Sequence, residues 1–226
     1  MRNQLTSEAR AALDRAGFSR RNFLKTSGAL IVSFSLGTAE AQFGIAPIPG
    51  SPPEGQLDSW IAIAADGSVT AFSGKEELGQ GISTAQTQLV AEELCVPLQR
   101  VSLVYCDTAR TPDQSYTSGS QSHPANFNHE NLAQAAATAR EALLRLASER
   151  LGVPAEQLTA ADGAVRVKSD SSRQVTYADL VGGKKFHLAV DERARRKPAS
   201  EWTVLGTPVP RADMPALVTG QFEFVH

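Results

Sequence analysis

A change of hydrophobic period near residue 80 constrains the fold more than any other feature. Apolar and polar side chains alternate through residues 68–73, as in a half-buried strand, whereas apolar side chains recur at helical spacing through residues 82–94. Gly79, Gln80 and Gly81 separate the two patterns. The sequence therefore predicts a strand, a glycine-rich turn and a helix in direct succession.

Two Asp-Gly pairs predict β-hairpins. Asp66-Gly67 lies between the alternating runs 59–64 and 68–73, and Asp162-Gly163 repeats the pattern later in the chain. A further apolar run, residues 101–106, is typical of a strand. These runs predict antiparallel pairing at two separate places in the chain.

A long alanine-rich helix is predicted from Pro124 to about Leu151, because its apolar residues form one stripe. Residues 176–180 are expected to form a short helix, and residues 185–190 a short strand. We therefore expect an α+β fold, in which β-hairpins and a mixed sheet pack with two main helices.

Charge and cysteine content exclude some classes of function. The net charge is −2 and the pI is about 6.1, so the chain lacks the basic footprint of a nucleic-acid-binding protein. The basic cluster at residues 193–197 is expected to be a solvated face. Cys95 and Cys106 cannot supply the roughly four thiolates that an iron–sulfur cluster needs, and we expect both to be buried core thiols.

The N-terminus carries a motif typical of twin-arginine export signals. Arg20 and Arg21 precede an apolar run at residues 28–36, which is shorter than the ~20 residues of a transmembrane helix. An A-x-A-like site ends at Ala41. We predict a twin-arginine signal peptide over residues 1–41, a periplasmic location, and a Pro/Gly-rich linker over residues 42–56.

Two glycine-containing segments before helices are candidate ligand cradles. One is the turn of Gly79, Gln80 and Gly81, whose glycines permit close approach to a backbone with free N–H groups at the start of the next helix. The other is a polar loop that contains Thr117, Gly119, Ser120, Gln121 and Ser122. Such cradles suit phosphate or a heterocycle rimmed with hydrogen-bonding atoms. Ordinary glycine turns with helix caps remain the alternative.

The common catalytic motifs do not occur. The chain lacks a complete P-loop, the third glycine of a dinucleotide fingerprint and a G-x-S-x-G elbow. Its four histidines show no metal-ligand spacing, so we name neither a metal site nor a catalytic residue from the motifs.

Three stretches carry a resemblance to a known family. They are GKEELGQGISTAQTQLVAEELCVPLQRVSLV, YTSGSQSHPA with the alanine-rich segment after it, and GTPVPRADMPALVTGQFEFVH. Residues 57–226 resemble the N-terminal portion of the molybdopterin-binding large subunit of the xanthine dehydrogenase and aldehyde oxidase family. The resemblance is closest to large subunits similar to nicotinate dehydrogenase and isoquinoline oxidoreductase.

The resemblance implies a molybdenum hydroxylase that oxidises an aldehyde or N-heterocycle. It implies a molybdenum cofactor, molybdopterin, with the cytosine dinucleotide as one form. Iron–sulfur clusters would reside on a partner small subunit, and a cytochrome c is one candidate acceptor. The implied cofactor contacts are the candidate residues of the two cradles: Gly79, Gln80, Gly81, Thr117, Gly119, Ser120, Gln121 and Ser122.

The resemblance also implies what this chain lacks. The family's catalytic glutamate lies far beyond His226, so its role is not assigned to Glu76, Glu77, Glu92 or Glu93. We expect a molybdopterin-binding-like domain at residues 57–203, the start of a following domain at residues 204–226, and no activity without the rest of the large subunit.

Two other functions stay open. The chain could be a non-catalytic structural or subunit-docking module, or a remnant without activity, and a solvent-facing Gln80 would favour this over cofactor binding. It could also be an exported binding protein for another polar ligand.

Overall fold

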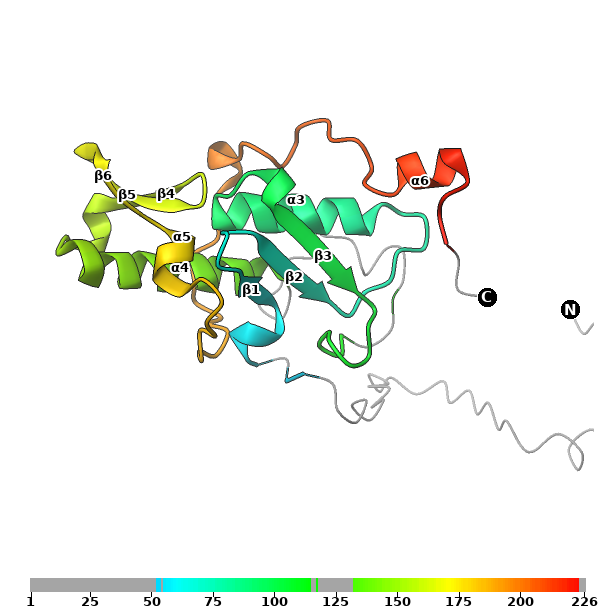
Figure 1. Ribbon diagram of the computed structural model, residues 1–226, viewed down its shortest axis with the longest axis horizontal. Helices are drawn as coiled ribbons and strands as arrows, with labels where there is room; N and C mark the ends of the chain where they lie inside the picture. The colour runs from blue at the N-terminus through cyan, green and yellow to red at the C-terminus, as the bar shows by residue number, and fades with distance from the viewer. Residues whose placement is uncertain (1–51, 54, 115–116, 118–131, 224–226) are drawn as a thin grey trace, which may run out of the picture. The chain divides into compact units, whose positions relative to one another are not determined.

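The computed structural model is shown in Figure 1. The chain divides into two units, residues 1–44 and 45–226, and the described residues all belong to the second. The predicted leader, most of the linker and the start of the predicted long helix lie outside them, and the predicted domain boundaries stay predictions. The structure describes residues 52–53, 55–114, 117 and 132–223.

The elements alternate between strands, helices and short 3-10 turns. In chain order they are η1 (Leu57–Ser59), β1 (Ile61–Ile63), β2 (Val69–Ser73), α3 (Ile82–Leu94), η2 (Leu98–Arg100), β3 (Val101–Tyr105), α4 (Leu132–Leu151), η3 (Ala155–Gln157), β4 (Leu158–Ala161), β5 (Ala164–Val167), β6 (Asp170–Thr176), α5 (Tyr177–Val181), η4 (Ala199–Glu201) and α6 (Met214–Thr219).

The first sheet has the order β1-β2-β3 and is mixed. β1 and β2 form the predicted antiparallel hairpin, with Ile61 opposite Ala71. β2 and β3 run parallel, with Val69 opposite Val101. A parallel pair needs a crossover connection, which α3 provides, and α3 contacts β3. The turn before α3 therefore lies beyond the carboxyl end of β2.

The second sheet is an antiparallel meander with the order β4-β5-β6. Its first turn contains Asp162 and Gly163, both at positive φ, as the Asp-Gly pair predicts. The two sheets are separate in the chain and in the hydrogen-bonding pattern.

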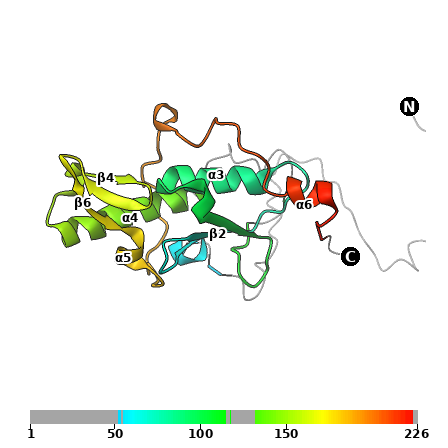
Figure 2. The same ribbon diagram turned by 45° about the horizontal axis from the view of Figure 1, so that its top comes forward.

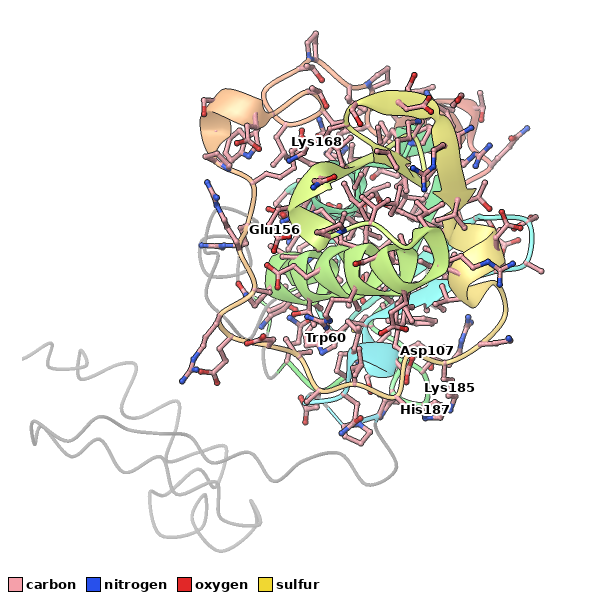
Figure 3. All side chains as sticks on the ribbon, turned by 90° about the vertical axis from the view of Figure 1, so that its left-hand side faces the viewer. Trp60, Asp107, Glu156, Lys168, Lys185 and His187 are labelled. Atoms are coloured by element: carbon pink, nitrogen blue, oxygen red, sulfur yellow. The ribbon has the colours of Figure 1, made fainter. Side chains whose placement is uncertain are left out.

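Helix α4 joins the two sheets into one core. It packs along α3 and contacts strands of both sheets. Small side chains make close packing possible, since the buried face of α4 includes Ala133, Ala135, Ala136, Ala139, Ala142 and Ala147. Trp60, on the side of α4 opposite Lys168 in Figure 3, is 1% exposed. The Tyr177 hydroxyl donates to the Leu94 carbonyl over 2.7 Å and ties α5 to the end of α3.

The predicted α+β class, the mixed sheet, two main helices and the bounds of the first helix are confirmed. The predicted strand at residues 185–190 is wrong, because the segment forms only a single bridge, Gln56 with Ala189. Strand β6 was missed, since its exposed polar residues show no apolar alternation. No helix in the described part of the chain is long and apolar enough to cross a membrane.

The prediction of two core thiols is wrong for Cys106. Its side chain is exposed, and Cys95 is only partly buried. Cys106 follows the last residue of β3 and has φ 50°, so the backbone turns there and carries the side chain out of the sheet.

Candidate functional site

The predicted Gly79–Gly81 turn has the backbone shape that requires glycine. Gly79 has φ 98° and Gly81 has φ 76°, conformations that residues with a Cβ atom rarely adopt. Gly81 is the N-cap residue of α3. Around Gly79 no heavy atom lies within 4 Å of the place where a Cβ atom would stand, so its conformation, rather than crowding, selects glycine.

Two backbone N–H groups of this turn, those of Gly79 and Gly81, are already bonded to Glu77. Its Oε1 accepts from the Gly79 and Gly81 amides, each at 2.9 Å. Its Oε2 accepts from the Ser83 amide at 3.0 Å and the Ser83 hydroxyl at 2.9 Å. The expectation of free N–H groups at the start of α3 is therefore wrong for the Ser83 amide. A carboxylate two residues before the first glycine caps the helix.

Gln80 lies at the exposed tip of the turn. Its Nε2 donates to the Glu76 carbonyl at 3.0 Å, and its Oε1 accepts from the Leu78 amide. A glutamine amide has two N–H donors and two lone pairs. These two bonds fix the side chain and leave one donor and one acceptor for a ligand.

The structure brings Thr117 to the same turn. Thr117 Oγ1 accepts from the Glu76 amide at 3.0 Å, and Gln114 Oε1 accepts from the Gly74 amide at 2.7 Å. A Cβ atom at Gly74 would lie 2.2 Å from the Pro112 carbonyl oxygen, so only glycine permits this approach. Thr117 of the second predicted cradle therefore lies beside the segment that leads into the first. The rest of the second cradle lies outside the described residues: Gly119, Ser120, Gln121 and Ser122.

Sequence reasoning missed Arg211. Its Nη1 donates to the Gly79 carbonyl at 2.9 Å, its Nη2 lies 3.8 Å from Glu77 Oε1, and its Nε donates to Asp213 Oδ1 at 2.9 Å. The next amide, that of Ala212, donates to Thr84 Oγ1 at 2.9 Å. The only sequence signal for a role of Arg211 is the pair of opposite charges in Arg211-Ala212-Asp213. Figures 1 and 2 show α6, which follows this corner, beyond the N-terminal end of α3.

Acidic groups surround the turn. Burial would raise the pKa of Glu77, but the bonds from Ser83, Gly81 and Gly79 outweigh it and the pKa is lowered. Burial first, and then the charges of Glu76, Glu77 and Asp213, raise the pKa of Tyr105. A hydrogen bond to Glu76 raises the pKa of Cys106 to about 11, which makes this thiol a poor nucleophile.

The opposite end of α3 holds two buried glutamates. Glu92 forms an ion pair with Lys197, and Glu93 forms one with Arg140 at 2.6 Å. Burial opposes ionisation of Glu92, yet bonds from Lys197 and the amides of residues 203–205 lower its pKa, whereas burial raises that of Glu93. The basic cluster at residues 193–197 is thus not wholly a solvated face.

A cleft of about 500 Å3 lies at this second end, far from the Gly79–Gly81 turn. Its lining includes Cys95, Arg140, Lys168, Arg195 and Glu201. Lys168 Nζ donates to the Glu156 carbonyl at 2.7 Å, and Figure 3 labels both residues. The lining of the cleft includes none of the four predicted cofactor contacts that the structure describes, Gly79, Gln80, Gly81 and Thr117.

The turn fits one kind of ligand better than another. Gln80 offers an exposed donor and acceptor that suit the edge of a heterocycle such as a pterin. Phosphate is a poorer fit, because Glu77 fills the amides that would bind it. A buried acceptor without a partner among the described residues, Gln86 Oε1, lies on the same helix. The described residues hold no group of three or more His, Cys, Asp or Glu that could bind a metal ion.

Comparisons with known proteins agree with a cofactor-binding domain. Residues 11–213 match the family described as the molybdopterin cofactor-binding domain. A nicotinate dehydrogenase subunit of Pseudomonas putida is 35% identical over 210 residues, which cover 92% of this chain and 17% of that protein. The membrane-bound aldehyde dehydrogenase (pyrroloquinoline-quinone) of Gluconacetobacter polyoxogenes is 30% identical over 215 residues, which cover 92% of this chain and 27% of that protein.

Among solved structures, quinoline 2-oxidoreductase from Pseudomonas putida 86 has a TM-score of 0.45 and 24% identity over 54% of this chain and 15% of that one. The chain thus spans less than a third of the length of these relatives. Because the family match takes in most of the sequence, the chain belongs to the molybdopterin cofactor-binding domain family of xanthine dehydrogenase and aldehyde oxidase large subunits.

Proposed function

We propose that this chain is the N-terminal, cofactor-binding part of the large subunit of an exported molybdenum hydroxylase. Its substrate class would be an aldehyde or an N-heterocycle, which the names of the two relatives support. The observation that carries the proposal is the match of residues 11–213 to the molybdopterin cofactor-binding domain, and the Gly79–Gly81 turn, where Gln80 keeps one donor and one acceptor for a ligand, is the proposed contact.

The bound cofactor would supply oxygen-atom and electron transfer. Gln80 would bind the edge of the pterin through its remaining N–H and lone pair. Thr117 would hold the second segment against the first through the Glu76 amide. Four glutamates of the described residues have structural contacts: Glu77 caps α3, Glu92 and Glu93 form ion pairs, and Glu76 contacts Cys106. As the family resemblance implies, the catalytic base would come from the remaining part of the large subunit.

The proposed partners are an iron–sulfur small subunit and the remaining part of the large subunit, with a cytochrome c as one candidate acceptor. The nicotinate dehydrogenase relative is itself named as one subunit of an enzyme. Leu78, Met214 and Val218 are large apolar side chains with exposed fractions of 63%, 41% and 72%, and they belong to the turn and to α6. Exposed apolar side chains of this kind favour contact with another protein surface.

Export to the periplasm is proposed from the sequence. Arg20 and Arg21, the short apolar run and Ala41 support it. The family match begins at residue 11, inside the proposed leader. The N-terminal sequence of the protein from its own periplasm would decide the matter, with a start at Gln42 expected.

A second candidate is a structural or subunit-docking module that never touches the cofactor. Two observations favour it: Gln80 is exposed in this chain, and the amides of its turn are bonded to Glu77. A solvent-facing Gln80 is the outcome that we expected for a structural module.

The test is the composition of the native protein purified from the periplasm. We expect co-purification of an iron–sulfur chain and the rest of the large subunit, with molybdenum and pterin bound. A Gln80→Ala variant should retain about tenfold less pterin on dilution, since it loses a hydrogen bond to the ligand. Gln99→Ala, at an exposed glutamine on η2, is the matched control. Equal pterin and molybdenum in both variants would favour the structural module.

A further inference from the structure

The Gly79–Gly81 turn is folded around a carboxylate of its own chain. Successive backbone amides in turns with positive φ form a concave surface that commonly binds anions, and a helix N-terminus adds to the attraction. Here the anion at the centre is the Glu77 carboxylate, which accepts three amide bonds and one hydroxyl bond. The site that could take an external phosphate is therefore already filled.

The carbonyl groups of the two glycines are engaged as well. The Gly79 carbonyl accepts from Arg211 at 2.9 Å, and the Gly81 carbonyl accepts from the Ala85 amide at 3.1 Å. The turn is thus fixed from the inside by Glu77 and from the outside by Arg211. The group that it presents outward is the side chain of Gln80.

We propose that Glu77 is a positioning residue, a built-in anion that holds the Gly79–Gly81 turn in shape and closes the Gly79, Gly81 and Ser83 amides to phosphate. Its carboxylate is well placed to stay charged, because its side chain is 6% exposed and carries bonds from four donors. The guanidinium of Arg211, 3.8 Å away, adds a favourable charge. That the ligand of Gln80 is a pterin rests on the function proposed above.

The proposal is tested by removing the Glu77 carboxylate and supplying a free carboxylate, formate, in solution. The 226-residue chain and its Glu77→Ala variant are unfolded by heat in sodium formate and in sodium chloride at equal ionic strength. We expect the variant's Tm in chloride to fall by about 4 °C, the usual effect of losing a helix cap in a chain of this size. Formate should restore at least half of the loss in the variant and leave the original chain unchanged.

Glu76→Ala is the matched control. It removes a neighbouring carboxylate that accepts from the Glu77 amide at 3.1 Å and not from the glycine amides. Its Tm should be the same in the two salts. An equal formate response in all three proteins would overturn the proposal, and so would an unchanged Tm in Glu77→Ala.

Should Glu77→Ala fail to fold, Glu77→Gln gives a second readout. Glutamine keeps one carbonyl oxygen but turns an N–H group toward the donors. Amide hydrogen exchange in peptides covering residues 78–84 should be about tenfold faster than in the original chain, with β4–β6 unchanged. Unchanged exchange at residues 78–84 would count against Glu77. Neither readout needs a cofactor, so formate rescue with no molybdenum in the native protein would retain this inference and reject the proposed function.

Discussion

The two ends of helix α3 both gather backbone amides around a glutamate, but the amides come from different parts of the chain. At the N-terminal end, Glu77 accepts amides that lie two to six residues away. At the C-terminal end, Glu92 Oε2 accepts the amides of residues 203–205, more than a hundred residues later. The same chemistry thus shapes a local turn at one end and fastens a distant segment at the other.

The two ends of α3 also differ in how far their polar side chains are exposed to solvent. Glu92 is 0% exposed and forms an ion pair with Lys197, whereas the turn around Glu77 has Gln80 exposed at its tip. Between the two ends the distant segment runs beside α3, since the Gln88 side chain donates to the Val204 carbonyl at 3.2 Å. The C-terminal end therefore fastens a distant segment to the core, and the N-terminal end leaves the Gln80 side chain exposed.

Loss of the Glu92 carboxylate should have the largest effect. Glu92→Ala leaves three amides and the Lys197 ammonium without their acceptor in a buried place. Breaking a buried ion pair in this way usually costs about 3–5 kcal/mol. Urea unfolding should show a loss of that size in the free energy of unfolding.

Glu156→Ala is the control for this loss. Glu156 is exposed on η3, and a surface substitution of this kind should change the free energy of unfolding by at most about 0.5 kcal/mol. If Glu92→Ala changed the free energy of unfolding as little as Glu156→Ala, Glu92 would not hold residues 197–207. The contrast between the two ends of α3 would then be wrong.

Local sequence patterns predicted the elements but not these contacts. The helix at residues 82–94 and both Asp-Gly hairpins are confirmed, because hydrophobic period and turn residues act within a few positions. Strand β6 was missed, since an exposed polar edge strand owes its pairing to its neighbour β5 rather than to its own side chains.

The candidate site stays a prediction, but the structure describes the contacts of four of its residues. Gly79, Gln80, Gly81 and Thr117 do lie together. The capping by Glu77 was missed, although an acidic residue shortly before a helix is a known signal for a cap. Arg211 was beyond reach, because its contact with Gly79 spans 132 positions and depends on the path of residues 197–213.

Acid should reduce stability at both ends. The pKa values of Glu77 and Glu92 are lowered by folding from a reference of 4.5, so the folded state binds fewer protons than the unfolded state. Their contribution is present above pH 4.5 and is lost as the pH falls through the lower folded-state pKa values. The difference in free energy of unfolding between the original chain and Glu77→Gln should therefore narrow on acidification from pH 7 to about pH 3. A difference that stays constant would show that the Glu77 charge does not stabilise the turn.

The smallest expected effect concerns how α3 ends. Cys95 follows α3 at φ 54°, and Gly152 follows α4 at φ 65°, so the same left-handed cap is made once by cysteine and once by glycine. The next valine closes each cap through a bond of 3.1 Å from Val96 to Ala91 and of 3.2 Å from Val153 to Ser148.

Single substitutions at the two cap residues should change the free energy of unfolding in opposite directions. Cys95→Gly should raise the free energy of unfolding by about 0.5 kcal/mol, because glycine adopts positive φ without strain while the partly buried thiol contributes some packing. Gly152→Ala should lower it by about 1 kcal/mol through backbone strain, since no heavy atom stands within 4 Å of the new Cβ atom. Urea unfolding of both variants measures the sign of each change in the free energy of unfolding. A loss in Cys95→Gly as large as that in Gly152→Ala would show that packing of the Cys95 thiol, and not backbone conformation, governs the C-terminal end of α3.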